Sequence, residues 1–233
     1  MTRHTSAALV ARVVEIGESD LIATLITEGL GKVSAAVRGG RKSSRRVGGS
    51  LEAMHTVEVD LDDRGGELMT LRESRITRCR VRLTRSLPGL ESAGLALRWA
   101  RHLFPPRVPE IHGWRALVEL LDALDDDDAR CGQEVARAGL RILGAAGYAL
   151  DLERCVLCGL SCPDGKVATV DAARGGLVCH ACGGAKTVLT ASARRAARAL
   201  LDGRTADVTA SEAAAVVALV RDAMACHAGF EGP

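Results

Sequence analysis

The chain has 233 residues, of which 47% are hydrophobic, enough for one large domain or about two to three small ones with a buried core. Its 31 basic and 29 acidic side chains leave a net charge of +2, so overall charge indicates no particular partner. The N-terminus lacks the apolar stretch of a signal peptide, and no segment approaches the roughly 18 apolar residues of a membrane helix. We therefore expect a cytoplasmic protein without a membrane partner.

The first third of the sequence has the pattern of β-strands. Alternating runs rich in β-branched residues are separated by turns rich in glycine and aspartate, and nothing between them is long enough for a helix that crosses between parallel strands. This predicts a five-stranded antiparallel barrel of the OB-fold type over residues 1–80, with an SH3-like barrel as the alternative. The predicted strands are residues 8–16, 21–27, 32–37, 55–61 and 67–76.

From about residue 88 the apolar residues recur with the period of helices, which predicts an α-helical domain over 81–233 and an α+β chain overall. Prolines at 105, 106 and 109 separate the first two helices, and the acidic run Asp125–Asp128 is expected to be a solvated loop that ends the second. Ser211 is the predicted N-cap of the last helix. The predicted helices are residues 90–103, 114–124, 131–150, 192–201 and 211–227.

Two C-x₂-C motifs lie within this helical part, with twenty residues between them. Such spacing predicts a four-cysteine zinc ribbon, because tetrahedral Zn²⁺ takes four thiolates and each motif can direct two sulfurs at one ion. The ribbon would be an insertion at about residues 152–188 between helices of one domain. The predicted ligands are Cys155, Cys158, Cys179 and Cys182.

Cys162 and His180 are the competitors for a ligand position, since each lies close in sequence to a motif. A catalytic zinc keeps a position open beside three protein ligands, whereas four cysteines close the site, so a structural role is favoured. A redox pair of C-x₂-C motifs is the alternative, but neither motif lies at the strand-to-helix junction of a thioredoxin-like βαβ unit. Cys79, Cys131 and Cys226 are interpreted as ordinary thiols.

The densest basic segment lies between the third and fourth predicted strands and carries five cations in nine residues with no acid. Glycine and serine around them allow close approach to a polyanion, and arginine suits phosphate oxygens, so the segment indicates nucleic-acid binding; a solubilising loop is the alternative. The predicted DNA-binding residues are Arg38, Arg41, Lys42, Arg45 and Arg46.

Aromatic residues make up only 2% of the chain, and none precedes residue 99. OB-folds that grip single strands commonly stack bases on aromatic side chains. Binding through residues 1–80 is therefore expected to be electrostatic, weakly sequence-selective and steeply dependent on salt.

The order of barrel, basic loop, helices and four-cysteine insertion resembles the RecO family of bacterial DNA-repair proteins, over nearly the full chain. The helical part is supported by pattern more than by motif, and none of the short motifs is specific alone. They include Gly17–Asp20, Thr27–Lys32, Gly39–Ser43, Leu51-Glu52, Gly66–Leu68, Leu71–Glu73, and Gly175-Gly176 before Cys179.

This resemblance implies a recombination mediator without enzymatic activity. Such a protein binds single- and double-stranded DNA, anneals complementary strands, and with RecR helps RecA replace the single-strand-binding protein SSB; it would be associated with the nucleoid. One departure concerns Ala53-Met54, where many members have Pro-Phe after the Leu-Glu pair. The change removes an aromatic side chain and puts a stacking role there in doubt.

Two other classes of function remain as alternatives. A zinc-ribbon RNA-binding or transcription factor could use the same loop and ribbon, but it would not accelerate annealing of complementary DNA. A zinc-dependent hydrolase or nuclease is disfavoured, because the chain has no H-E-x-x-H motif, no P-loop and no pair of carboxylates beside the cysteines.

Overall fold

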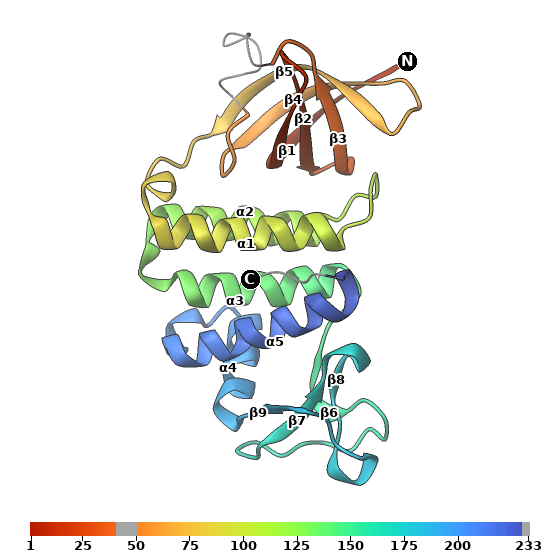
Figure 1. Cartoon of the computed structure of the whole chain (residues 1–233). Helices are drawn as coiled ribbons and strands as arrows, with labels where there is room; N and C mark the ends of the chain where they lie inside the picture. The colour runs from red at the N-terminus through yellow and green to blue at the C-terminus, as the bar shows by residue number, and fades with distance from the viewer. Residues whose placement is uncertain (41–50, 230–233) are drawn as a thin grey trace. The chain divides into compact units, whose positions relative to one another are not determined.

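The computed structural model describes residues 1–40 and 51–229, which fall into two compact units divided after Asp128 (Figure 1). The first unit contains a barrel and two helices, and the second contains three helices and a small sheet. The domain limits expected from the sequence, 1–80 and 81–233, stay a proposal. No helix in the described part of the chain is long and apolar enough to cross a membrane.

The first unit begins with a closed barrel in which the strand order is β1-β2-β3-β5-β4. Neighbouring strands are antiparallel except β3 and β5, which pair in parallel between residues 34–36 and 68–70. This arrangement confirms the predicted OB-like barrel. The strands are β1 (Thr2–Ile16), β2 (Asp20–Thr27), β3 (Gly31–Val37), β4 (Thr56–Asp63) and β5 (Leu68–Arg78).

The barrel interior is filled by aliphatic side chains, as the lack of aromatic residues requires. Alternate residues of each strand point inward, so the burial pattern of β3 alternates along its length. Leu51, just before β4, is buried in the same core and ties the chain back to the barrel. The core consists of Ala8, Val10, Ala23, Leu25, Val33, Ala35, Val37, Leu51, Val57, Val59, Leu61, Met69 and Leu71.

Two helices complete the first unit, α1 (Leu87–Leu103) and α2 (Ile111–Asp126). The Ser86 hydroxyl caps α1 by accepting from the Gly89 amide. Between the helices, the backbone of Val108 passes so close to Gly31 that a Cβ there would lie 2.0 Å from the Val108 carbonyl oxygen. Only glycine fits this approach, which is why the segment between the helices can lie against β3.

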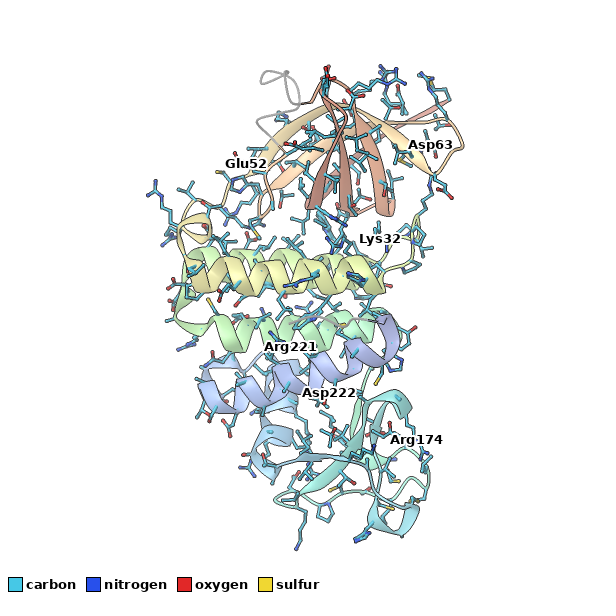
Figure 2. All side chains as sticks on the ribbon, viewed as in Figure 1. Lys32, Glu52, Asp63, Arg174, Arg221 and Asp222 are labelled. Atoms are coloured by element: carbon cyan, nitrogen blue, oxygen red, sulfur yellow. The ribbon has the colours of Figure 1, made fainter. Side chains whose placement is uncertain are left out.

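Buried and part-buried ion pairs fasten the barrel to the helices. The fully buried Arg80 donates to Asp122 of α2 at 2.8 Å and to the carbonyl oxygen of Met54 at 3.0 Å. Arg107, after α1, pairs at 2.7 Å with Asp63 of β4, which is labelled in Figure 2. Barrel and helix pair are thus joined by specific polar contacts as well as by packing.

The acidic run 125–128 was wrongly expected to be only a solvated loop. Helix α2 continues to Asp126, and the Asp125 carboxylate accepts from the Leu83 amide at 3.0 Å. The Ser86 hydroxyl donates to Asp128 at 2.6 Å. These carboxylates therefore organise the connection into α1.

The second unit consists of α3 (Cys131–Ala145), α4 (Ala191–Leu201), α5 (Ala210–Ala228) and a four-stranded sheet. Helix α3 ends five residues before the predicted limit, because Gly147 takes a left-handed conformation, with φ of +85°. The predicted cap of α5 was also wrong: Thr209, not Ser211, is the N-cap and forms a capping box with Glu212.

The small sheet has the order β6-β8-β7-β9 and lies between α3 and α4 in sequence. Its strands are short, and the close pairing of β6 with β8 brings the Asp151 backbone within 2.4 Å of where a Cβ of Gly176 would be. Glycine is therefore required at position 176. The strands are β6 (Asp151–Cys155), β7 (Ala168–Asp171), β8 (Gly176–Leu177) and β9 (Thr187–Leu189).

Asp62 of β4 is a buried carboxylate that the sequence did not reveal. Its side chain is fully covered, and it accepts from Arg3 at 3.1 Å and from Arg72 at 2.5 Å. The hydrogen bond from Arg72 is the main reason that the pKa of Asp62 lies below its usual value, and the bond from Arg3 contributes further. Asp62 therefore links β1, β4 and β5 across the outside of the barrel.

Replacing Asp62 with asparagine is expected to lower the stability of the first unit at neutral pH. Because the folded-state pKa is depressed, the ionised carboxylate stabilises the fold above its usual pKa of about 4, and this contribution is lost as the pH falls through the folded value. Urea unfolding at pH 7 and pH 3 measures the effect, with the exposed Glu67→Gln as control. An equal loss of stability at both pH values would contradict the assignment.

Candidate functional site

The four cysteines of the two C-x₂-C motifs come together in the small sheet. Cys155 is the last residue of β6 and Cys158 follows in the next turn, whereas Cys179 caps a single 3₁₀ turn of which Cys182 is the last residue. Their sulfur atoms all lie within 4.8 Å of one another, and the sulfurs of Cys158 and Cys179 are 3.6 Å apart. Tetrahedral coordination with Zn–S bonds of about 2.3 Å places sulfurs about 3.8 Å apart, so this group has the dimensions of a four-cysteine zinc site.

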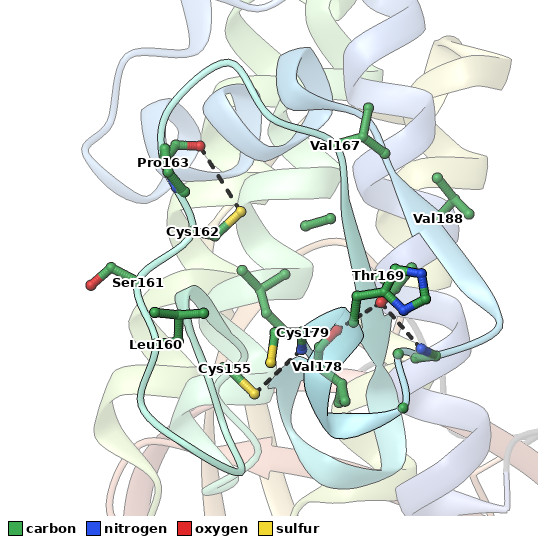
Figure 3. A pocket seen from close by; sticks show the side chains of 16 residues that line it. Cys155, Leu160, Ser161, Cys162, Pro163, Val167, Thr169, Val178, Cys179 and Val188 are labelled. Carbon is green, nitrogen blue, oxygen red and sulfur yellow. Dashed lines mark hydrogen bonds between the residues drawn. The ribbon is translucent and has the colours of Figure 1, made fainter.

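Backbone amides are directed at the buried sulfur of the group. The Cys179 amide donates to the sulfur of Cys155 at 3.3 Å (Figure 3). This bond, followed by those from the amides of Leu157 and Cys158, lowers the pKa of Cys155 to about 6. The local turns thus favour a thiolate, which is the form that binds metal.

The sulfurs of Cys158 and Cys182 show the opposite effect, a raised pKa, because several thiols share a small volume. The Cys179 thiol, and then that of Cys158, raise the pKa of Cys182 to about 12. Four thiolates at this distance repel one another unless a cation lies between them. A divalent ion at the centre would remove that repulsion, so the donor set suits Zn²⁺ and leaves no protein ligand position open.

Neither competitor for a ligand position belongs to the group. The thiol of Cys162 points to the carbonyl oxygen of Pro163 at 3.9 Å, away from Cys155 and Cys179 in Figure 3, and His180 is exposed. Both residues line an apolar pocket of about 490 Å³, together with side chains that include Leu160, Val167 and Val178.

Arg194 anchors the cysteine-rich sheet to α4, and sequence reasoning missed it. Its side chain is almost fully buried and donates to the carbonyl oxygens of Cys162, at 3.1 Å, and of Pro163. A buried arginine that satisfies two carbonyls holds the loop after Cys158 in place. No sequence signal distinguishes it from its exposed neighbour Arg195, except that position 194 falls on the apolar face of the helix.

The basic loop begins where the prediction placed it, directly after β3. Arg38 is exposed in a turn whose next residue, Gly39, donates its amide to Asp20 at 2.8 Å. The loop returns to the barrel at the buried Leu51. Arg41, Lys42, Arg45 and Arg46 lie outside the described residues.

Comparison with known protein families and curated sequences shows which family the chain resembles. Residues 1–80 match the model of the N-terminal part of recombination protein O, and residues 90–231 match that of its C-terminal part. The chain belongs to the RecO family.

Individual RecO proteins align over most of their own length. The chain is 37% identical to the DNA repair protein RecO of Anaeromyxobacter dehalogenans strain 2CP-1 over 184 residues, which cover 78% of this chain and 71% of that protein. It is 35% identical to the protein of the same name from Anaeromyxobacter strain Fw109-5, over 93% of this chain and 86% of the relative. Membership of the family implies a role in DNA repair and recombination.

Proposed function

We propose that this RecO-family protein is a recombination mediator that binds single- and double-stranded DNA and anneals complementary strands. With RecR it would promote the loading of RecA onto DNA coated with SSB. The function is one of binding, without covalent chemistry. The observation that carries the proposal is an OB-like barrel with the arginine-rich connection 38–46 between β3 and β4.

The chemistry of the barrel supports annealing in particular. Two complementary strands repel each other through their phosphates, and a cationic loop reduces this repulsion. Because no phenylalanine, tyrosine or tryptophan precedes Trp99, the barrel lacks the large aromatic rings on which OB-folds commonly stack bases. When a strand is held only through its backbone phosphates, its bases remain free to pair with a complementary strand.

We also propose that Cys155, Cys158, Cys179 and Cys182 hold a structural Zn²⁺. Their sulfurs have the spacing of a tetrahedral site, and backbone amides orient the buried one. Such an ion supplies cross-linking of the two C-x₂-C turns and no catalysis.

DNA binding by the wild-type protein is expected to weaken steeply as salt rises. If the basic loop neutralises about four to five phosphates, it should contribute about −3 to the slope of the logarithm of the affinity for single-stranded DNA against the logarithm of salt concentration. Fluorescence anisotropy with oligonucleotides of different sequence measures the slope. An affinity that changes little with salt, or differs strongly between sequences, would contradict electrostatic binding.

A further inference from the structure

The last two turns of α1 carry three basic side chains on one face. Arg98, Arg101 and His102 are spaced at i, i+3 and i+4, so they project from neighbouring positions on the helix surface. His102 is exposed, and the two arginines are half-buried. No motif in the sequence marks these three residues as a group.

The barrel adds two more cations from its outer surface. Arg12 of β1 lies opposite Thr24, and Lys32 of β3 lies opposite Ile26. The residues next to these partners, Ala23 and Leu25, point into the barrel core, so Arg12 and Lys32 point outward.

Helix α1 covers this same side of the barrel. Leu9 pairs with Ile26 in the β1–β2 ladder, and both side chains are buried although neither belongs to the barrel core. Helix α1 contacts β1 and β2, which accounts for their burial. The basic end of α1 is thereby brought next to the outward-facing cations of the strands.

Direct contacts show how close the cations are. The Lys32 ammonium donates to the carbonyl oxygen of Arg101 at 2.7 Å, beside α1 in Figure 2. The Arg101 guanidinium lies 3.5 Å from the ring nitrogen Nε2 of His102. We call the set Arg12, Lys32, Arg98, Arg101 and His102 the α1 basic cluster.

The positive charges of the cluster repel one another. Burial lowers the pKa of Arg101, and the charges of Arg12 and Arg98 lower it further. Although His102 is exposed, partial desolvation by its surroundings lowers its pKa, and four cations lower it further, of which Arg101 has the largest effect. The negative end of the α1 dipole offsets part of this repulsion near Arg101 and His102, but Arg12 belongs to a strand. The concentration of positive charge in the cluster favours the approach of an anion such as a phosphate group.

We propose that the α1 basic cluster is a second phosphate-binding surface for single-stranded DNA, separate from the basic loop. Lys32 and Arg38 lie at opposite ends of β3, and six residues of strand span about 20 Å. Two segments of nucleic acid can therefore be held at once, one at each surface. The inference rests on the proposed DNA-binding function and extends it.

The test compares salt dependence in variants of the full-length protein. Arg12→Gln, Arg98→Gln and Arg101→Gln are combined; Lys32 is kept because it supports the end of α1. The matched control removes the same charge at three exposed arginines elsewhere, Arg85, Arg115 and Arg130. Binding of a mixed-sequence oligonucleotide of about 40 nucleotides is measured over a range of salt, because each lost phosphate contact reduces the slope by about 0.7.

The cluster variant is expected to lower the magnitude of the slope by about 2, in the wild-type background and also when the basic loop is already neutralised. The control variant should change it far less. If wild-type protein binds DNA and the cluster variant keeps the same slope, this inference alone fails; if wild-type protein does not bind DNA, the proposed function fails with it.

A folding defect is recognised by circular dichroism and by the single variant Arg12→Gln. Arg12 is exposed on a strand, so its loss leaves the packing of α1 intact and should still reduce the slope by about 0.7. An unchanged slope in this folded single variant would overturn the role of Arg12.

Discussion

Replacing Cys179 with serine is expected to abolish zinc binding and to loosen the segment from β6 to β9. The segment of about 40 residues is too short to be held by its own core, as is usual for units of that size. The few buried apolar side chains in its strands and turns include Leu152, Val170, Leu177 and Leu189. Structural zinc in small domains contributes about 10 kcal/mol or more, so its loss should exceed the effect of any single core substitution.

Elemental analysis and limited proteolysis measure this effect. Wild-type protein should carry one zinc ion per chain, and Cys179→Ser should carry essentially none and be cleaved between β6 and β9 while α3, α4 and α5 persist. Cys162→Ser is the matched control, since its thiol lies in the same segment but points to Pro163. Unchanged zinc content in Cys179→Ser, or equal loss in Cys162→Ser, would show that the ligand set is wrong.

The second large effect concerns the basic loop. Combined replacement of Arg41, Lys42, Arg45 and Arg46 by alanine is expected to slow annealing of complementary strands by about ten-fold or more at moderate salt, because four phosphate contacts are removed. The fold should be unaffected, since the four residues lie between Gly40 and Leu51, which are both buried against the barrel.

Stopped-flow fluorescence with labelled complementary oligonucleotides gives the annealing rate. A control variant that neutralises the exposed Arg85, Arg115, Arg130 and Lys166 has the same change in net charge and should anneal at nearly the wild-type rate. Equal rates in the loop variant and the control would remove the loop from the mechanism.

The barrel and the cysteine group were predictable because each leaves a short-range signal. Alternation of apolar residues marks β3 even though its partner β5 lies about thirty residues further on. The spacing of the cysteines likewise sufficed to predict that four sulfurs come together, although the strands between the two motifs were not predicted. The resemblance to the RecO family then indicated that the barrel and the four-cysteine insertion belong to one known arrangement of domains.

The polar contacts that could not be predicted from the sequence join residues of distant segments. The Asp125 carboxylate reads as a solvated charge until the Leu83 amide is placed beside it. Asp62 and Arg194 look like surface residues, because their partners come from other elements. The α1 basic cluster is divided among β1, β3 and α1, so none of these three segments stands out in the sequence as the basic loop does.

Helix limits were missed for a different reason. Thr209 and Ser211 are both good N-cap residues, and Glu212 decides between them by completing a capping box with Thr209 alone. At the end of α3, the turn at Gly147 stops a pattern of apolar residues that would otherwise continue to Leu150. Local hydrogen bonding, and not hydrophobic periodicity, sets both limits.

The most direct measurement of the proposed function is annealing of complementary single strands that are already coated with SSB. The wild-type protein is expected to accelerate pairing of these strands, and the acceleration should decline as salt rises, because it depends on phosphate contacts. A pairing rate no higher than that of SSB-coated strands alone would contradict the account of this protein as a recombination mediator.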